Sequence, residues 1–396
     1  MTCGKRTTAR DNPLPLRWQR ESSTVSRARF GTFAGVFTPT VLTILGIILF
    51  LRLGWVVGQA GLLGSIVIIL IASAISLITG FSLSSIATNM HVRVGGAYYM
   101  ISRTLGIEIG GAIGLPLYLS QAISVAFYII GFSEAFTSVM PMVDARLLST
   151  GIAVTFGLLA YVGADFTLKI QYLVLMVLAA ALASFFGGGW DQWVAPHVLG
   201  AAESGGVPFW HVFAIFFPAV TGITVGLSMS GDLKDPRRSI PHGTLAAIGI
   251  TTAIYIASAL WLATHATTGQ LIDDNLIMQK IARWPFLILL GVWLATLSSA
   301  LGSVVAAPRT LQAVSHDRVV PRIFGSQLGS ATEPRFAVLV TTVIAVSVIW
   351  AGDLNFVAPI ITMFFLNTYG MINLSAGIES FVGNPSFRPR FSVPWA

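Results

Sequence analysis

The sequence predicts an all-α polytopic membrane protein with about ten spans. Charged residues make up 10% of its 396 positions and hydrophobic residues make up 55%, a balance far from that of soluble domains. A helix needs about 20 apolar residues to cross the hydrocarbon layer of a bilayer. Stretches of roughly this length occur at 35–58, 61–86, 107–136, 146–164, 168–187, 209–230, 243–267, 283–306, 334–351 and 355–379.

Two of these stretches are interrupted, about half the chain apart. The first interruption is Gly46, within 41–48, and the second runs from Pro218 to Gly222, within 217–226. Lipid offers no partner for free N–H and C=O groups, so a broken helix persists only where those groups face protein, water or a solute. Freed carbonyls suit a cation and freed amides suit an anion. Paired interruptions are typical of transporters with a site near the bilayer midplane, so we expect an ion carrier.

The net charge of +7 is explained by membrane topology. Of the 23 Lys and Arg residues, 19 lie in the N-terminal segment or in alternate loops. The positive-inside rule therefore places residues 1–30, as a tail, and residues 381–396, as a stub, in the cytoplasm. We expect no nucleic-acid partner. The single cysteine, Cys3, excludes an intramolecular disulfide framework.

The predicted spans carry almost no ionisable residue near their centres. Glu108, Glu134, Asp165, His265 and Glu379 all fall near span ends. A proton-driven pump normally has a buried Asp, Glu or His, so proton coupling is disfavoured. A cation and an anion bound a few ångströms apart would instead neutralise each other in such a site. No Walker, zinc or dinucleotide motif occurs, so we expect neither enzyme activity nor a cofactor.

Five passages resemble the cation–chloride cotransporter family. They are LFLRLGWVVGQAG from Leu49, GGAYYMISRTLG from Gly95, FFPAVTGITVGLSMSGDLKDPRRSIPHGTL from Phe216, ATLSSALGSVVAAPRTLQAVSHDRVVP from Ala295 and APIITMFFLNTYGMINLS from Ala358. The resemblance implies a LeuT-type fold of 5+5 inverted repeats, which amino acid permeases share. The transport domain would be 31–380, with repeat one at about 31–190 and repeat two at about 205–380. Family members normally have twelve spans and a C-terminal domain, so we expect spans 11 and 12 and that domain to be absent here.

The resemblance also implies ion ligands at the two broken helices and on span eight. The expected sodium ligands are Leu42, Leu45, Ala295, Ser298 and Ser299. The expected potassium ligands are the carbonyls of Thr43, Ile44 and Pro218, the Tyr128 phenol, and Thr221. The expected chloride contacts are Gly46, Ile47 and Ile48 at one site, and Gly222, Ile223, Thr224 and the Tyr369 hydroxyl at the other. The serine pair and Tyr128 favour the sodium–potassium–two-chloride subtype.

Simpler structural roles remain open for several of these residues. On spacing alone, Ser298 and Ser299 would be small packing residues between helices. Tyr128 would be a core aromatic with a satisfied hydroxyl. Gly46 and Gly222 would be helix-contact glycines.

Arg52 lies toward the outer end of the first span. An interfacial anchor whose charged head reaches water is the preferred interpretation. The alternative is a gating pair with an acidic residue such as Glu134.

Together these features predict a secondary symporter in the plasma membrane that moves Na⁺, K⁺ and Cl⁻ by alternating access. Its partners would be inorganic ions and the lipid bilayer, and the family resemblance allows for a homodimer. One alternative is an amino acid permease of the same fold, although the bulky neighbours of Gly46 leave little room for an amino acid. The other alternative is a truncated fragment that does not transport.

Overall fold

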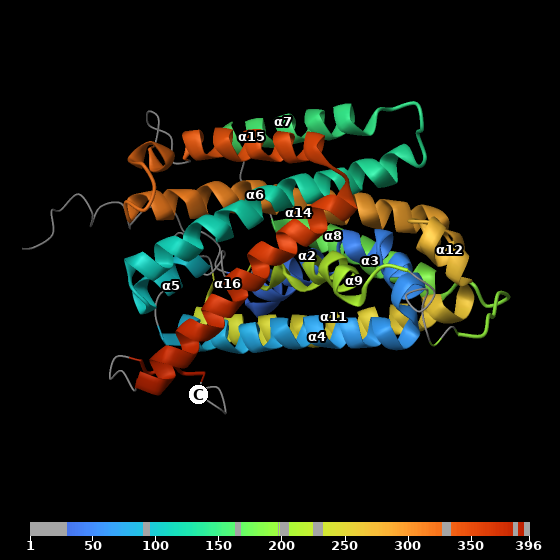
Figure 1. Cartoon of the computed structure of the whole chain (residues 1–396), viewed down its shortest axis with the longest axis horizontal. Helices are drawn as coiled ribbons and strands as arrows, with labels where there is room; N and C mark the ends of the chain where they lie inside the picture. The colour runs from blue at the N-terminus through green and yellow to red at the C-terminus, as the bar shows by residue number, and fades with distance from the viewer. Residues whose placement is uncertain are drawn as a thin grey trace, which may run out of the picture.

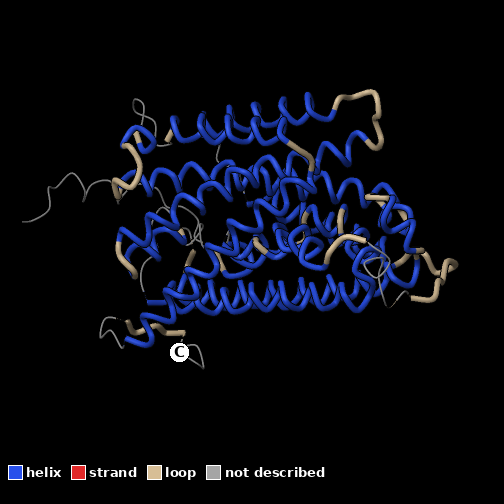
Figure 2. The backbone as a smooth tube through the Cα atoms, viewed as in Figure 1, coloured by secondary structure: helices blue, strands red, loops and turns tan. Residues whose placement is uncertain are grey.

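The chain folds into a bundle of long helices (Figures 1 and 2). A computed structural model describes residues 30–89, 96–162, 168–196, 198, 206–224, 233–326, 334–382 and 387–391. Most of the predicted N-terminal tail, together with Arg93 and Asp165, lies outside these residues. Within them no strand occurs, and Phe30 and Leu233 form an isolated β-bridge.

The helices occur in the following order along the chain. The first half contains η1 (Phe33–Phe37), α2 (Thr38–Ile44), α3 (Ile47–Leu51), α4 (Leu53–Asn89), α5 (Ala97–Thr104), α6 (Ile107–Thr137), α7 (Ala145–Val162) and α8 (Leu168–Phe186). The second half contains α9 (Phe209–Phe216), η3 (Phe217–Val220), η4 (Gly222–Thr224), α11 (Pro236–His265), α12 (Thr268–Asp273), α13 (Ile277–Ile281), α14 (Pro285–His316), η6 (Arg322–Gly325), α15 (Arg335–Ala351) and α16 (Leu354–Val382).

Each of the ten predicted spans corresponds to an apolar helix in the described residues, although the ends of the predicted spans 146–164 and 209–230 lie outside them. Among the described residues, seven helices are long and apolar enough to cross a membrane, and Ile170–Phe186, Phe209–Thr224 and Arg335–Ala351 are three shorter apolar helices. The first two spans meet at Gly61, which has φ 68° and ψ 175° inside α4. Glycine tolerates this left-handed φ because it has no Cβ. The first part of α4 therefore completes the first span, and the part after Gly61 is the second.

Both predicted helix breaks are confirmed. In the first span α2 ends at Ile44, and Gly46, with φ −96° and ψ −137°, precedes α3. In the sixth span α9 passes into the 3₁₀ turn η3, which carries Pro218 in its first turn, and η4 follows Thr221. Proline has no N–H to donate and obstructs a regular α-helix, which accounts for the tightening at this point.

The two breaks lie together in the interior of the bundle. Helix α2 contacts η3 and η4, and α3 contacts η3. In the most apolar part of the first span 83% of residues are buried, whereas the corresponding share of α7 is 17%. In Figure 1, α2, α3 and α9 lie between the α7–α15 layer and the α4–α11 layer. The broken helices are thus screened from lipid, as their free backbone groups require.

The two ends of the bundle are named here by the short helices that mark them. The α12 end carries α12 and lies at the right of Figure 1, and the α5 end carries α5 and lies at the left. At the α5 end part of the predicted stub is described, and it lies against α4. The Arg388 amide donates to Asn89 Oδ1 at 2.7 Å and the Phe391 amide donates to Thr88 Oγ1 at 3.2 Å.

Candidate functional site

The expected ion ligands of the two broken helices adjoin one another. A Cβ added at Gly222 would lie 2.7 Å from Thr43 Cβ and 3.3 Å from Ile44 Cγ1. Such a separation is too short for two carbon atoms, so the close approach of the helices requires glycine here. Gly222 is therefore a helix-contact residue, and the expected potassium and chloride residues of both helices lie in one region.

The first break leaves backbone groups without their helical partners. In the described part of the chain, no amide of Gly46 or of α3 donates to a carbonyl of α2 or of Leu45. The carbonyls of Leu42 and Thr43 therefore lack the amide that a continuous helix would supply. The Thr43 hydroxyl turns back to its own helix and donates to the Pro39 carbonyl at 2.8 Å. This bond uses the hydroxyl proton and leaves the lone pairs of Oγ1, together with the backbone carbonyl, as oxygen donors for a cation.

Side-chain hydroxyls occupy several carbonyls at the second break. Thr221 donates to the Pro218 carbonyl through Oγ1 at 2.8 Å and through its amide at 3.3 Å. Ser76 Oγ donates to the Val220 carbonyl at 2.8 Å. The Tyr369 hydroxyl donates to the Thr221 carbonyl at 2.5 Å. A phenol has one proton, so Tyr369 can serve chloride only when this bond is exchanged.

Three tyrosines surround the two breaks. Tyr128 on α6 is 6% exposed, and within the described residues its hydroxyl has no hydrogen-bond partner. Tyr255 on α11 donates its hydroxyl to the Ile44 carbonyl at 2.8 Å. Of these three tyrosines, Tyr128 is the one whose hydroxyl does not donate to a backbone carbonyl among the described residues.

Helix α14 brings the expected sodium ligands toward the first broken helix. It contacts both α2 and α3. Ala295 is buried, Ser298 is half-buried, and Ser299 is 7% exposed. Ser299 Oγ is buried and has no hydrogen-bond partner among the described residues. A buried hydroxyl is normally hydrogen-bonded. The unpaired Ser299 oxygen is therefore the expected sodium ligand on α14 that best fits that role.

The first-turn residues of α3 carry the expected contacts of one chloride. Gly46 precedes the helix, and Ile47 and Ile48 open it; all three are buried. The first amides of a helix have no intrahelical acceptor. A Cβ added at Gly131 of α6 would overlap Ile47. The absence of a side chain at Gly131 therefore lets α6 pack closely against this turn.

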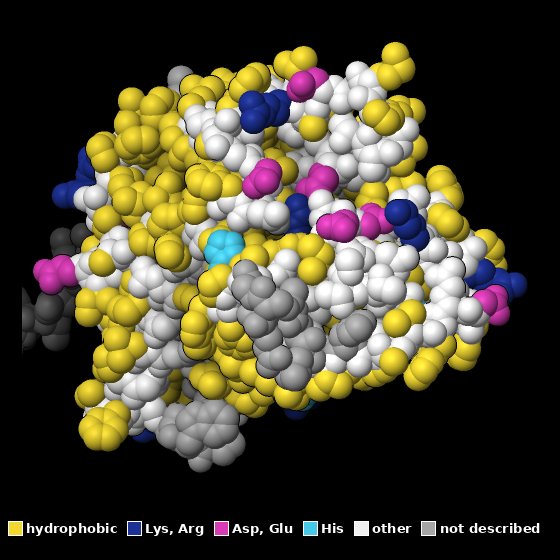
Figure 3. Space-filling view, turned by 45° about the vertical axis from the view of Figure 1, so that its right-hand side comes forward, with side chains coloured by type: hydrophobic (Ala, Val, Ile, Leu, Met, Phe, Trp, Pro, Cys, Tyr) yellow, Lys and Arg dark blue, Asp and Glu magenta, His cyan; other side chains and the backbone are white. Residues whose placement is uncertain are grey.

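Arg52 is buried and bonds two residues from other parts of the chain at the α12 end. Its Nη1 and Nη2 donate to the two carboxylate oxygens of Glu134 at 2.8 and 2.9 Å, and its Nε donates to Asn355 Oδ1 at 2.7 Å. Asn275 Nδ2 adds a bond to Glu134 Oε1 at 2.7 Å. We call Arg52, Glu134, Asn275 and Asn355 the clasp. Figure 3, which turns the α12 end forward, shows acidic and basic side chains in a row across this face.

The preferred interpretation of Arg52 as an interfacial anchor is wrong. Its side chain is 3% exposed and is fully engaged with the clasp, whereas an anchor would extend its charged head into water. The alternative pairing with Glu134 is the one that occurs.

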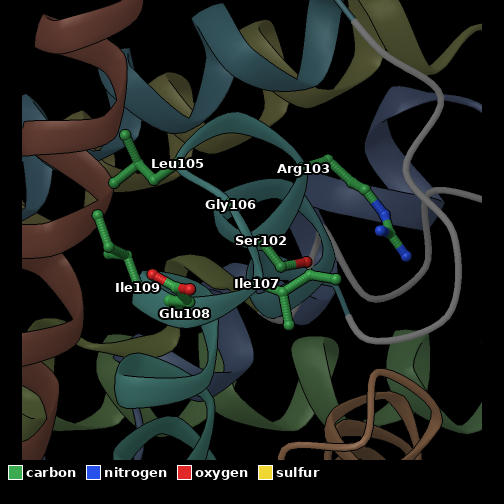
Figure 4. A pocket seen from close by; sticks show the side chains of 7 residues that line it. All are labelled: Ser102, Arg103, Leu105, Gly106, Ile107, Glu108 and Ile109. Carbon is green, nitrogen blue, oxygen red and sulfur yellow. The ribbon is translucent and has the colours of Figure 1, made fainter.

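A surface cavity lies away from the breaks, at the α5 end. It measures about 510 Å³ and is lined by Ser102, Arg103, Leu105, Gly106, Ile107, Glu108 and Ile109. Figure 4 shows Arg103 and Glu108 on opposite sides of this turn. Arg103 pairs with Asp317 Oδ1 at 3.0 Å. None of the expected ion ligands lines this cavity.

The comparisons with known proteins identify the family. A model described as amino acid permease matches residues 35–394. The chain belongs to the amino acid permease family.

Within this family the chain is similar to solute carrier family 12. It is 34% identical to mouse solute carrier family 12 member 1 over 437 residues, covering 94% of this chain and 40% of the relative. It is 35% identical to mouse member 2 over 425 residues, covering 92% of this chain and 35% of the relative. The chain thus spans about two fifths of the length of the curated relatives it matches. These relatives are cation–chloride cotransporters, so the resemblance carried by the motifs is confirmed.

Two solved structures share the fold. One is Mhp1, a nucleobase–cation symporter with bound bromovinylhydantoin, at a TM-score of 0.55 and 17% identity over 92% of this chain and 84% of that one. The other is MhsT in complex with L-phenylalanine, at a TM-score of 0.55 and 14% identity over 91% and 96%. Both have the LeuT-type fold, so the predicted fold is confirmed. At these identities they carry no information about the solute.

The candidate site of this family member consists of buried backbone and hydroxyl groups. Sequence reasoning missed two of its residues, Ser76 and Tyr255, because each lies in an apolar span with no motif of its own. The only signal available was a polar atom at the middle of a span, which a membrane helix rarely leaves unpaired.

Proposed function

We propose that the chain is a secondary symporter that moves Na⁺, K⁺ and Cl⁻ together by alternating access. The observation that carries this proposal is the meeting of two broken helices in a buried site without a charged ligand. No Asp, Glu, Lys, Arg or His occurs among the expected ion ligands. A lone ion in such a site would be very costly, and a neighbouring ion of opposite charge removes most of that cost.

The distribution of free groups supports a division between cations and anions. Among the described residues the Leu42 and Thr43 carbonyls have no backbone partner and Ser299 Oγ has no partner. These oxygens and the Tyr128 phenol are acceptors that suit Na⁺ and K⁺. The first amides of α3 are donors that suit chloride. On this proposal no cofactor takes part.

The clasp supports alternating access. It ties the junction of α3 and α4 to α6, to α16 and to the segment between α12 and α13. Opening the α12 end requires these bonds to break. The distribution of Lys and Arg places the N-terminus in the cytoplasm, and the α12 end, which follows the seventh span, would then face the outside of the cell membrane.

Tracer uptake tests the proposal. The 396-residue chain is reconstituted in proteoliposomes, and uptake of ⁸⁶Rb⁺, which replaces K⁺, is measured while sodium and chloride are replaced one at a time. We expect uptake to require both ions. Uptake by folded protein that is indifferent to both would contradict the symport proposal, and uptake that needs chloride alone would contradict the role of sodium and of Ser299.

An amino acid permease is the second candidate, because the family model that matches the chain carries that description. Against it, Leu45, Ile47 and Ile48 are all buried around Gly46, which leaves little room for a carboxylate and its side chain. Competition of a panel of amino acids against rubidium uptake distinguishes the two. Displacement or uptake of any amino acid would favour the permease.

A further inference from the structure

The two broken helices are capped by hydroxyl groups at equivalent carbonyls. On the first, Tyr255 of α11 donates to the Ile44 carbonyl at 2.8 Å. On the second, Ser76 of α4 donates to the Val220 carbonyl at 2.8 Å. Ile44 lies two positions before Gly46, and Val220 lies two positions before Gly222. The same backbone group is therefore bonded at each break.

The donors are related by the internal symmetry of the fold. Ser76 belongs to the second span and bonds the sixth, and Tyr255 belongs to the seventh span and bonds the first. In a 5+5 inverted repeat, spans one and two of the first repeat correspond to spans six and seven of the second. The contact between spans seven and one is thus the symmetry mate of the contact between spans two and six. Each repeat caps the broken helix of the other.

We propose that Ser76 and Tyr255 are positioning residues that fix the direction of the Val220 and Ile44 carbonyls beside the two breaks. The last carbonyls of a helix segment have no intrahelical partner, and an unrestrained peptide at a break can rotate. Both donor hydroxyls are buried, so water does not compete with them. Each bond uses one of the two lone pairs of the carbonyl oxygen and leaves the other at a fixed angle. This inference rests on the proposed ion transport at the breaks.

The two caps have different consequences because their surroundings differ. At the second break the Pro218 and Thr221 carbonyls are also bonded, by Thr221 and by Tyr369. The negative end of that helix segment is thereby largely neutralised, which favours the anion expected at Gly222. At the first break the Leu42 and Thr43 carbonyls have no backbone partner within the described part of the chain, which favours cations. We therefore assign Tyr255 to cation affinity and Ser76 to chloride affinity.

Conservative variants of the two donors test this assignment. The Tyr255→Phe variant keeps the buried ring and removes only the hydroxyl, and Ser76→Ala does the same for the smaller side chain. Loss of one such bond should raise the half-saturating concentration about three- to tenfold. We expect this rise for rubidium in Tyr255→Phe and for chloride in Ser76→Ala, with maximal uptake changed less than about twofold. Ser76→Thr, which retains a hydroxyl, should keep the half-saturating chloride concentration at the wild-type level.

Matched controls exclude a general effect of losing a buried hydroxyl. Tyr118 of α6 shares a hydrogen bond with Thr341 at 3.2 Å, and Ser84 bonds the Gly80 carbonyl within α4 at 2.6 Å. Tyr118→Phe and Ser84→Ala should leave both half-saturating concentrations unchanged. Thermal stabilisation of the detergent-purified protein by added KCl supplies a second measure of ion affinity.

The outcomes separate this inference from the transport proposal. Unchanged half-saturation in both Tyr255→Phe and Ser76→Ala, or a fall in maximal uptake alone, would overturn the positioning role while leaving symport intact. Equal effects in the control variants would overturn it as well. Wild-type uptake that ignores sodium would overturn the three-ion proposal, yet a rubidium shift confined to Tyr255→Phe would still support the cap. Wild-type protein that neither transports nor is stabilised by KCl would overturn both.

Discussion

Replacing Glu134 by Gln should open the α12 end of the protein. The substitution keeps the shape of the side chain but removes its charge and one of the two oxygens that accept from Arg52. Arg52 is buried, whereas Glu134 is 27% exposed, so the loss should be smaller than for a fully buried pair. A hydrogen bond to a charged group contributes about 2 kcal/mol. Destabilising the closed state by this amount raises the ratio of open to closed protein about thirtyfold.

Cysteine modification measures that ratio. Leu354, beside Asn355, is fully buried and lies near Gly131, so a cysteine there is protected while the clasp is closed. In a Cys3→Ser background, Leu354→Cys is the only thiol. The rate of its reaction with a charged, membrane-impermeant thiol reagent should follow the open population.

We expect the Glu134→Gln variant to react about thirtyfold faster than its parent. Lys280→Gln is the matched control, since Lys280 pairs with Asp274 in the same region but is 73% exposed. Such surface pairs contribute at most about 1 kcal/mol, so its rate should barely change. A less than threefold increase in Glu134→Gln, with folding intact, would refute the idea that the clasp holds this end closed.

Two further substitutions test the site itself. Ser299→Ala removes a buried hydroxyl of α14 that has no partner among the described residues. It should raise the half-saturating sodium concentration of rubidium uptake about tenfold without lowering thermal stability. An unchanged sodium dependence would mean that Ser299 is only a packing residue. Gly222→Ala places a carbon atom 2.7 Å from Thr43 Cβ and should lower the free energy of unfolding by about 1–3 kcal/mol, seen as a lower melting temperature. Gly249→Ala, whose Cβ would meet nothing within 4 Å, is its control, and equal melting temperatures would contradict the close approach of the two breaks.

The sequence alone determined the spans and the places where two of them break. Span number follows from runs of apolar residues, because the bilayer demands a minimum length. The breaks follow from Pro218, Gly46 and Gly222, because backbone freedom and a missing N–H act locally. Short-range chemistry was sufficient for these features. The family motifs could also be read from the sequence, because each is a contiguous stretch of the chain.

Only the tertiary structure decided which polar groups meet. Arg52 bonds Glu134, which is 82 residues away along the chain. Ser76 bonds Val220 across 144 residues, and Tyr255 bonds Ile44 across 211 residues. Nothing in the local sequence distinguishes Tyr255 from a core aromatic or Arg52 from an interfacial anchor. The choice is made when the inverted repeats pack together, since a carbonyl freed by a break is bonded only where packing brings a donor within reach. The partner of each group is thus a property of the packed bundle.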